Sequence, residues 1–169
     1  FRLDASRTQS LRLIYTQAEL PRDRESLFWL NVLEVPPTEA LQAGEPTNKL
    51  HLIIRTRVKV FFRPTDLKGS AREAPASIRW ELVRGANGGA MLRGTNPTPF
   101  HASFNHIAPK VGERSYPIEG GGMIAPGKSQ DFALSDGASA DAVLQSVEYS
   151  FIDDFGAIVP GRFEARRGG

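Results

Sequence analysis

The feature that most constrains the fold is a run of alternating side chains between residues 50 and 62. Apolar and basic residues take turns along it, and Thr56 breaks the apolar series, which is Leu50, Leu52, Ile54, Val58, Val60 and Phe62. Because successive side chains of a strand point to opposite faces, the pattern predicts a long strand with one oily and one basic face. This strand would be roughly twice the usual length of about 5–6 residues.

Most other periodic segments also predict strands rather than helices. Residues 10–15 alternate in polarity, and residues 27–35 are apolar on both parities, as in a strand that is covered on both faces. After a polar stretch at residues 65–76, further strands are predicted at residues 77–83, 90–95, 101–108, 130–134, 143–152 and 162–165, with a glycine turn at residues 120–122. The 16 glycines and 12 prolines supply the turns that such short strands require.

These segments predict an all-β chain in two parts that are joined near Pro64. We expect residues 1–63 to be the C-terminal portion of a first domain, residues 64–76 to be a hinge or linker, and residues 77–169 to be a second domain. The apolar faces of the first part need covering strands, so we expect this domain to lack its N-terminal strands. The opening residues, Phe1 to Asp4, show neither an initiator methionine nor a signal-peptide pattern, which indicates a start inside a longer protein.

Composition and charge argue against several classes of function. The net charge is only +2 and the arginines are spread along the chain, whereas nucleic-acid binders concentrate basic residues on one surface. No stretch approaches the ~18 consecutive apolar residues of a membrane span. The absence of cysteine excludes disulfides, thiol catalysis and cysteine-based zinc sites.

The remaining polar residues do not form a recognisable catalytic or metal-binding set. His101 and His106 are five residues apart, a spacing that fits neither one face of a strand nor a standard metal pair. Asp153 and Asp154 have no histidine or nucleophile in a recognisable relation to them. We therefore expect no enzyme activity, no metal and no cofactor.

One segment resembles a family signature. Residues 20–37, LPRDRESLFWLNVLEVPP, resemble the signature of the periplasmic pilus-assembly (fimbrial) chaperones, and residues 57–64, RVKVFFRP, are similar to the end of that family's donor strand and its hinge. Residues 96–100, NPTPF, and 153–156, DDFG, resemble turns of its second domain. The resemblance implies two immunoglobulin-like β-sandwich domains with a cleft between them. It also implies a periplasmic protein that binds, stabilises and caps pilus subunits and delivers them to the outer-membrane usher.

The resemblance implies a subunit-binding role for the alternating strand. It would pair with the edge of an immature pilus subunit, whose sandwich lacks a strand, and it would fill the subunit's pockets with Leu50, Leu52 and Ile54. Lys59 would anchor the subunit's C-terminal carboxylate, together with an arginine from a strand upstream of this chain. Parity places Lys59 on the face opposite the three apolar residues, unless a bulge shifts the register.

The resemblance also implies an ion network between the domains, formed by Glu25, Arg63 and Asp154. A bidentate arginine between two carboxylates is a sound geometric clamp. The loop at residues 38–49 is short and lacks cysteine, so the chain is similar to the short-loop group of the family, which tends to build rod-like pili.

Less specific interpretations stay open beside these. Alternation at residues 50–62 also suits an ordinary core-facing strand, and each charge of the network would be an ordinary surface residue in most proteins. The alternative function is a structural or adhesive β-sandwich component of a surface fibre, and an enzyme is a more distant one. The signature segment favours the chaperone, with pilus subunits and the usher as partners and without nucleic acid or membrane insertion. We also expect the exposed strands of the first part to pair either with a second copy of the chain or with a partner chain that supplies the missing strands.

Overall fold

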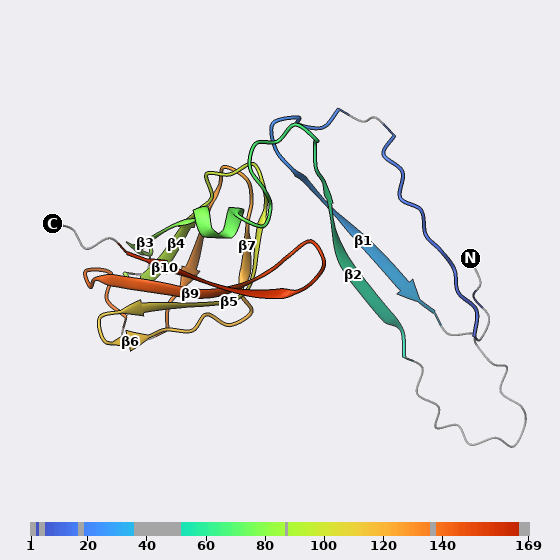
Figure 1. Ribbon diagram of the computed structural model, residues 1–169. Helices are drawn as coiled ribbons and strands as arrows, with labels where there is room; N and C mark the ends of the chain where they lie inside the picture. The colour runs from blue at the N-terminus through green and yellow to red at the C-terminus, as the bar shows by residue number, and fades with distance from the viewer. Residues whose placement is uncertain are drawn as a thin grey trace, which may run out of the picture.

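The protein consists of a β-sandwich and a long two-stranded ribbon that projects from it (Figure 1). The computed structural model describes residues 3, 6–16, 19–35, 52–86, 88–135 and 138–165. Leu50 and the predicted loop at residues 38–49 lie outside these ranges. Within them, every regular element is a strand except one short 3-10 helix, η1 (Ala74–Ser77), which confirms the all-β prediction.

The ribbon pairs β1 (Ser26–Glu34) with β2 (Ile54–Phe62) in antiparallel register, from Ser26 opposite Phe62 to Glu34 opposite Ile54. β2 is shorter than the predicted strand, because Leu52 precedes it without belonging to the ladder. A strand needs a partner to hydrogen-bond with. The pairing stops where β1 ends, and β2 therefore begins at Ile54.

The strand predicted at residues 10–15 is wrong. These residues are exposed and form no ladder with any strand of the described chain. Tyr15 contacts the ribbon, with its ring centroid 4.4 Å from that of Phe62. Alternating polarity alone does not supply the neighbouring backbone that a strand requires.

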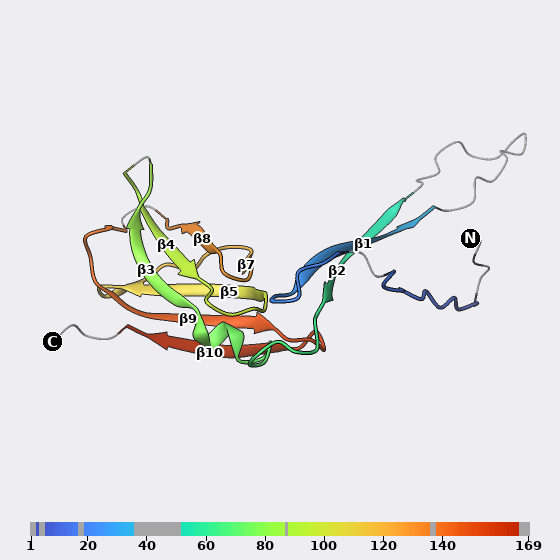
Figure 2. The same cartoon turned by 90° about the horizontal axis from the view of Figure 1, so that it is seen from above.

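The sandwich consists of two antiparallel sheets, which Figure 2 shows as two layers. One sheet has the order β10–β9–β5–β6, with β7 also paired to β5, and the other has the order β3–β4–β8. The strands are β3 (Arg79–Arg84), β4 (Ala90–Thr95), β5 (Ala102–Val111), β6 (Arg114–Ser115), β7 (Gly122–Ile124), β8 (Ser129–Ala133), β9 (Leu144–Ile152) and β10 (Ile158–Glu164). Six of them lie where strands were predicted, whereas β6 and β7 were missed.

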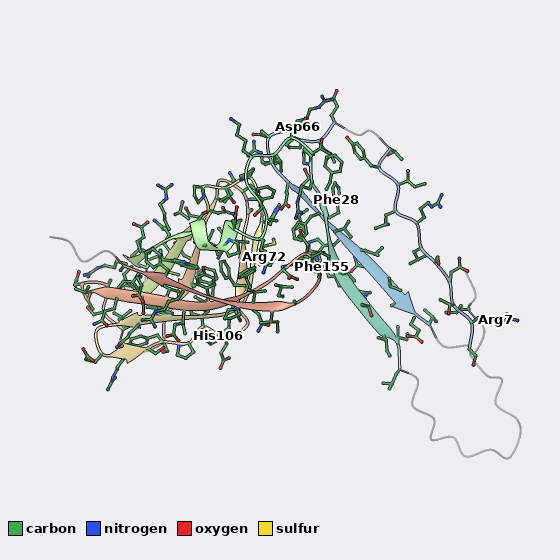
Figure 3. The ribbon with its side chains drawn as sticks, in the orientation of Figure 1. Arg7, Phe28, Asp66, Arg72, His106 and Phe155 are labelled. Atoms are coloured by element: carbon green, nitrogen blue, oxygen red, sulfur yellow. The ribbon has the colours of Figure 1, made fainter. Side chains whose placement is uncertain are left out.

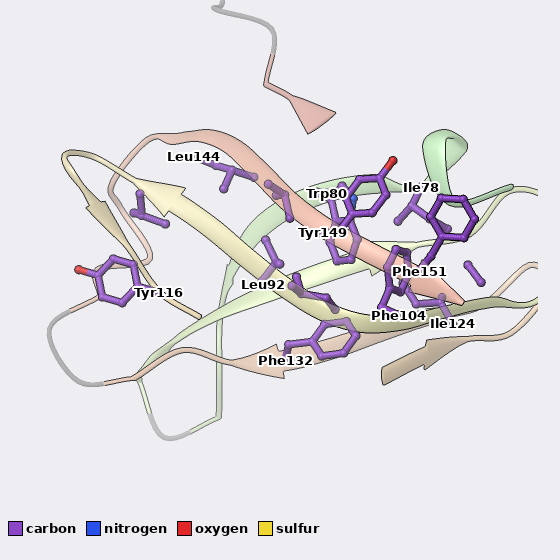
Figure 4. Close-up of a cluster of buried hydrophobic side chains, with 14 residues drawn as sticks. Ile78, Trp80, Leu92, Phe104, Tyr116, Ile124, Phe132, Leu144, Tyr149 and Phe151 are labelled. Atoms are coloured by element: carbon purple, nitrogen blue, oxygen red, sulfur yellow. The ribbon is translucent and has the colours of Figure 1, made fainter. Parts of the chain in front are cut away.

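The core lies between the two sheets and is rich in aromatic rings (Figure 4). Trp80 and Tyr149 both meet the ring of Phe104 edge-on, at centroid distances of 5.5 and 5.4 Å. Leu92 and Val147 are fully buried on opposite sheets. Aromatic pairs of this geometry add about 0.5–1.5 kcal/mol each beyond the apolar area that they bury. The sandwich thus has a well-packed core of its own.

The ribbon, by contrast, leaves apolar side chains in solvent. Phe28, Val32 and Val58 are exposed on the face that carries the even-numbered residues of both strands. The opposite face carries Trp29 and Lys59, which are opposite each other in the register. No helix of the described residues is long and apolar enough to cross a membrane.

Candidate functional site

A cleft of about 850 Å³ lies between the ribbon and the sandwich. Trp29 and Lys59 line it from the ribbon, Ser103 lines it from the first residues of β5, and the tip of the β9–β10 hairpin lines it from the far side. Figure 3 shows that hairpin reaching toward the ribbon, with Phe155 at its tip. The chain enters the sandwich from the ribbon through Arg63 and Pro64, directly after β2.

The structure brings Glu25, Arg63 and Asp154 together at the base of the ribbon. Arg63 Nε donates a 2.7 Å hydrogen bond to Glu25 Oε1. The two terminal nitrogens of Arg63 donate to the two carboxylate oxygens of Asp154, at 2.7 and 2.8 Å. One guanidinium thus joins the residue before β1 to the β9–β10 turn, although the three residues are far apart in the sequence.

Glu25 is the buried centre of this network, with a side chain only 2% exposed. Its Oε2 accepts a 2.7 Å hydrogen bond from the backbone N–H of His101 and lies 3.1 Å from His101 Nδ1. The backbone N–H of Glu25 donates to the carbonyl oxygen of Pro99. His101 is therefore a further member of the network, and its ring packs against Phe61 with centroids 5.1 Å apart.

The hydrogen bonds keep both carboxylates charged. Burial raises the pKa of Glu25, but the hydrogen bonds from His101 and Arg63 outweigh it and hold the pKa below its ordinary value. The hydrogen bond from Arg63 likewise lowers the pKa of Asp154, against a smaller effect of burial. The pKa of Arg63 is raised, mainly by its hydrogen bond to Asp154. Glu25, Asp154 and Arg63 are therefore all ionised at neutral pH.

Lys59 lies at the inner wall of the cleft. Its Nζ donates a 3.2 Å hydrogen bond to Ser103 Oγ and lies 5.8 Å from the centroid of the Trp29 ring. The guanidinium of Arg57 stacks on the same ring at 3.9 Å. Burial lowers the pKa of Lys59, because partial removal from water disfavours its charge. Within the described part of the chain no carboxylate forms an ion pair with Lys59.

Leu52 and Ile54 lie toward the other end of the ribbon. Their side chains are 66% and 55% exposed, and Leu50 lies outside the described residues. Among the described strands β2 is paired along one edge only, so the backbone N–H and C=O groups of its other edge have no strand partner. The structure thus separates the apolar residues from the cleft, as their opposite parity to Lys59 implied.

Sequence reasoning missed His101, Ser103, Trp29 and Phe155 as parts of the site. His101 and Ser103 directly follow the NPTPF turn, and Phe155 follows Asp154 within a quoted turn motif. These positions were therefore close to recognised segments. Their contacts depend on a second element that crosses them in space, and no local pattern records that.

The ribbon and the sandwich are thus joined by an ion network, and the cleft between them holds Lys59. Residues 1–68 match the family model "Pili and flagellar-assembly chaperone, PapD N-terminal domain". Residues 73–163 match "Pili assembly chaperone PapD, C-terminal domain". The chain belongs to this family of pilus-assembly chaperones, which confirms the resemblance seen in the sequence.

Individual relatives agree with the family models. The chain is 42% identical over 161 residues to "Probable fimbrial chaperone YadV" of Escherichia coli K12. The matched region covers 95% of this chain and 64% of the relative. It is 38% identical over 164 residues to "Chaperone protein FimB/FhaD" of Bordetella pertussis, covering 94% and 62%. The chain therefore spans somewhat less than two thirds of these curated relatives.

Solved structures share the fold. The crystal structure of the YadV chaperone matches with a TM-score of 0.69 and 37% identity, over 89% of this chain and 67% of that one. The SafB chaperone, solved in complex with the Salmonella enterica SafA pilin, matches with a TM-score of 0.66 and 29% identity, over 89% and 64%. These likenesses confirm the prediction of an immunoglobulin-like two-domain fold.

Proposed function

We propose that this chain is the subunit-binding portion of a periplasmic chaperone that captures pilus subunits by lending them a strand. The observation that carries the proposal is the open edge of β2, extended by the exposed side chains of Leu52 and Ile54. An unpaired strand edge beside apolar side chains is a template for another chain's strand. Family membership favours this role over that of a fibre component.

The energetics suit a capture that can later be reversed. A subunit that lacks one strand exposes a hydrophobic groove and unpaired backbone groups, and the donated edge satisfies both. Each buried leucine or isoleucine contributes at most about 1.5–3 kcal/mol before ordering costs are subtracted. Leu50 supplies a third such side chain in this proposal. The sum holds a partner firmly, and a strand from another subunit can still replace it.

Lys59 is proposed to anchor the subunit's C-terminal carboxylate. Its ammonium is already placed by Ser103 and Trp29, and it has no anionic partner among the described residues. A carboxylate arriving in the cleft would gain a charge-assisted hydrogen bond from a lysine that is partly removed from water. That contact fixes the end of the subunit chain and so sets the register in which the subunit meets the donated strand.

The network of Glu25, Arg63 and Asp154 is proposed to hold the angle between the ribbon and the sandwich. The three side chains join elements of both parts with hydrogen bonds of 2.7–2.8 Å. Delivery of the captured subunit to an outer-membrane usher completes the proposed function. Capture by binding requires no catalysis, metal or cofactor.

Co-purification of the chain with a pilus subunit from the same bacterium tests the proposal. Leu52→Asp places a charge in the subunit's groove, and Lys59→Ala removes the anchor, so both should reduce the captured subunit several-fold. Val143→Asp is the matched control, since Val143 is 72% exposed and lies outside the cleft and the ribbon. If neither Leu52→Asp nor Lys59→Ala reduces the amount of captured subunit, the assignment of these residues to subunit binding is refuted.

A further inference from the structure

Phe155 is a large apolar side chain that the fold leaves in solvent. It is 95% exposed, at the tip of the turn between β9 and β10. This turn lines the cleft together with Trp29 and Lys59, and Figure 3 shows Phe155 at the end of the hairpin nearest the ribbon. Single exposed apolar residues need no explanation in general. Phe155 differs from such residues because it lies at the rim of a cleft and on a turn whose conformation is fixed.

The turn that presents Phe155 is fixed from both sides. The carboxylate of Asp153 accepts the backbone N–H groups of Phe155 and Ala157, both at 2.9 Å. Asp154 is held by the two terminal nitrogens of Arg63, and Gly156 takes the left-handed conformation with φ +82°. A ring on such a turn loses little backbone freedom when it is buried by a partner, so it is a pre-organised contact.

The opposite wall of the cleft is also aromatic. The ring of Trp29 is held by Arg57 at 3.9 Å and remains partly exposed. Lys59 lies on the same wall, opposite Trp29 in the β1–β2 register. A ligand in this cleft therefore meets a cation at Lys59 and apolar surfaces at Trp29 and Phe155. A peptide end that combines a free carboxylate with an adjacent apolar side chain has the matching chemistry.

The charges of the cleft also favour a ligand with a free carboxylate. Its acidic groups are already occupied: Glu25 and Asp154 bind Arg63, and Asp153 caps its own turn. Lys59 and Arg72, which also lines the cleft, form no ion pair with another described residue. The cleft is therefore complementary to an anionic chain end rather than to a cationic one.

We propose that Phe155 is a specificity-determining contact that packs on an apolar side chain of the subunit's C-terminal segment, next to the carboxylate at Lys59. This inference rests on the proposed function. The Asp153–Asp154 turn then has two roles. Asp154 binds Arg63, and the next residue, Phe155, contacts the subunit. The clamp then fixes the direction of the ring as well as the angle of the ribbon.

The experiment uses the full chain and fluorescent synthetic peptides that copy the C-terminal segment of the subunit co-purifying with it. One peptide has a free carboxylate, a second is amidated, and a third has its apolar side chains replaced by alanine. Dissociation constants come from fluorescence anisotropy. Phe155→Ala should weaken binding of the first two peptides about 10- to 100-fold and leave that of the third unchanged. Lys59→Ala should weaken binding of the free-acid peptide and leave that of the amidated peptide unchanged.

Controls separate contact from folding. Phe155→Tyr should restore binding, and Val143→Ala, at another exposed apolar site outside the cleft, should have no effect. The midpoint of thermal unfolding should be the same for Phe155→Ala as for the unaltered chain, because the ring is not part of the core. Equal affinity of Phe155→Ala and the unaltered chain for the free-acid peptide would overturn this inference and leave the proposed function standing. If no subunit co-purifies with the unaltered chain, both fall.

Discussion

The buried carboxylate of Glu25 gives the sharpest test of how the two parts are joined. The substitution Glu25→Gln preserves the shape of the side chain and removes its charge. Both carboxylate oxygens accept hydrogen bonds, one from Arg63 Nε and the other from the His101 backbone N–H. An amide has one acceptor oxygen, so its NH₂ group must face one of these two donors. One contact is therefore lost whichever way the amide turns.

The magnitude follows from that count. A hydrogen bond to a charged group contributes about 1.5–3 kcal/mol, and a buried donor left without an acceptor costs a similar amount. The side chain is only 2% exposed, so water cannot readily replace the lost acceptor. We expect the junction to open about 2–3 kcal/mol more easily, which corresponds to about 30- to 150-fold faster exchange of the affected proton.

Hydrogen exchange followed by NMR measures this at the two donors themselves, the His101 amide and the Arg63 Nε–H. Glu148→Gln is the control, because Glu148 is an exposed residue of β9 whose arginine contact at 3.3 Å lies outside the network. One of the two protons should lose protection in Glu25→Gln and neither in the control. If both keep their protection in Glu25→Gln, the buried hydrogen bonds do not hold the junction and the reasoning fails.

Two further predictions concern pH and backbone conformation. The folded-state pKa values of Glu25 and Asp154 lie below their ordinary values of 4.5 and 3.8, so the network's contribution is complete above those values and is lost as pH falls through the lowered ones. Small-angle X-ray scattering should show the two parts separating only below about pH 4, and separation beginning near pH 6 would contradict this. Gly121→Ala should destabilise the sandwich by about 1–3 kcal/mol in denaturant unfolding, because Gly121 has φ +57° and a Cβ there would collide with the carbonyl of Phe104. Gly89→Ala, where a Cβ meets open space, should be nearly neutral, and equal effects of the two would refute the steric argument.

Much of the sandwich was predictable because its strands obey a simple rule. In β4, Ala90, Leu92 and Gly94 face the core while the residues between them are less buried, so period-two alternation placed the strand correctly. β6 and β7 were missed because two or three residues carry no period. The failure at residues 10–15 has another cause: a ladder depends on a neighbouring backbone, which a sequence pattern does not record.

The candidate site also has a part that local patterns predict and a part that they do not. The alternation near Lys59 gave its face correctly, because parity is local. Glu25, Arg63 and Asp154 were predicted together from the family resemblance alone. The polar turn around Glu25 gives no local sign that its side chain is almost fully buried. His101 and Phe155 escaped notice because their surroundings are created by the junction of two parts, each of which looks ordinary alone.

The geometry of the ribbon gives a physical reason for a clamp at its base. β2 has 9 residues, so at ~3.3 Å per residue Ile54 stands about 30 Å from Arg63. A rotation of only about 10° at the base would move that end by about 5 Å, which is a full spacing between paired strands. In the proposed function, a donated strand must be aimed by a stiff junction so that a carboxylate bound at Lys59 can set its register. In the same proposal, that stiffness comes from three short hydrogen bonds from one rigid guanidinium, together with the buried contact of Glu25 with His101. They lie at the point where a small rotation has the largest effect.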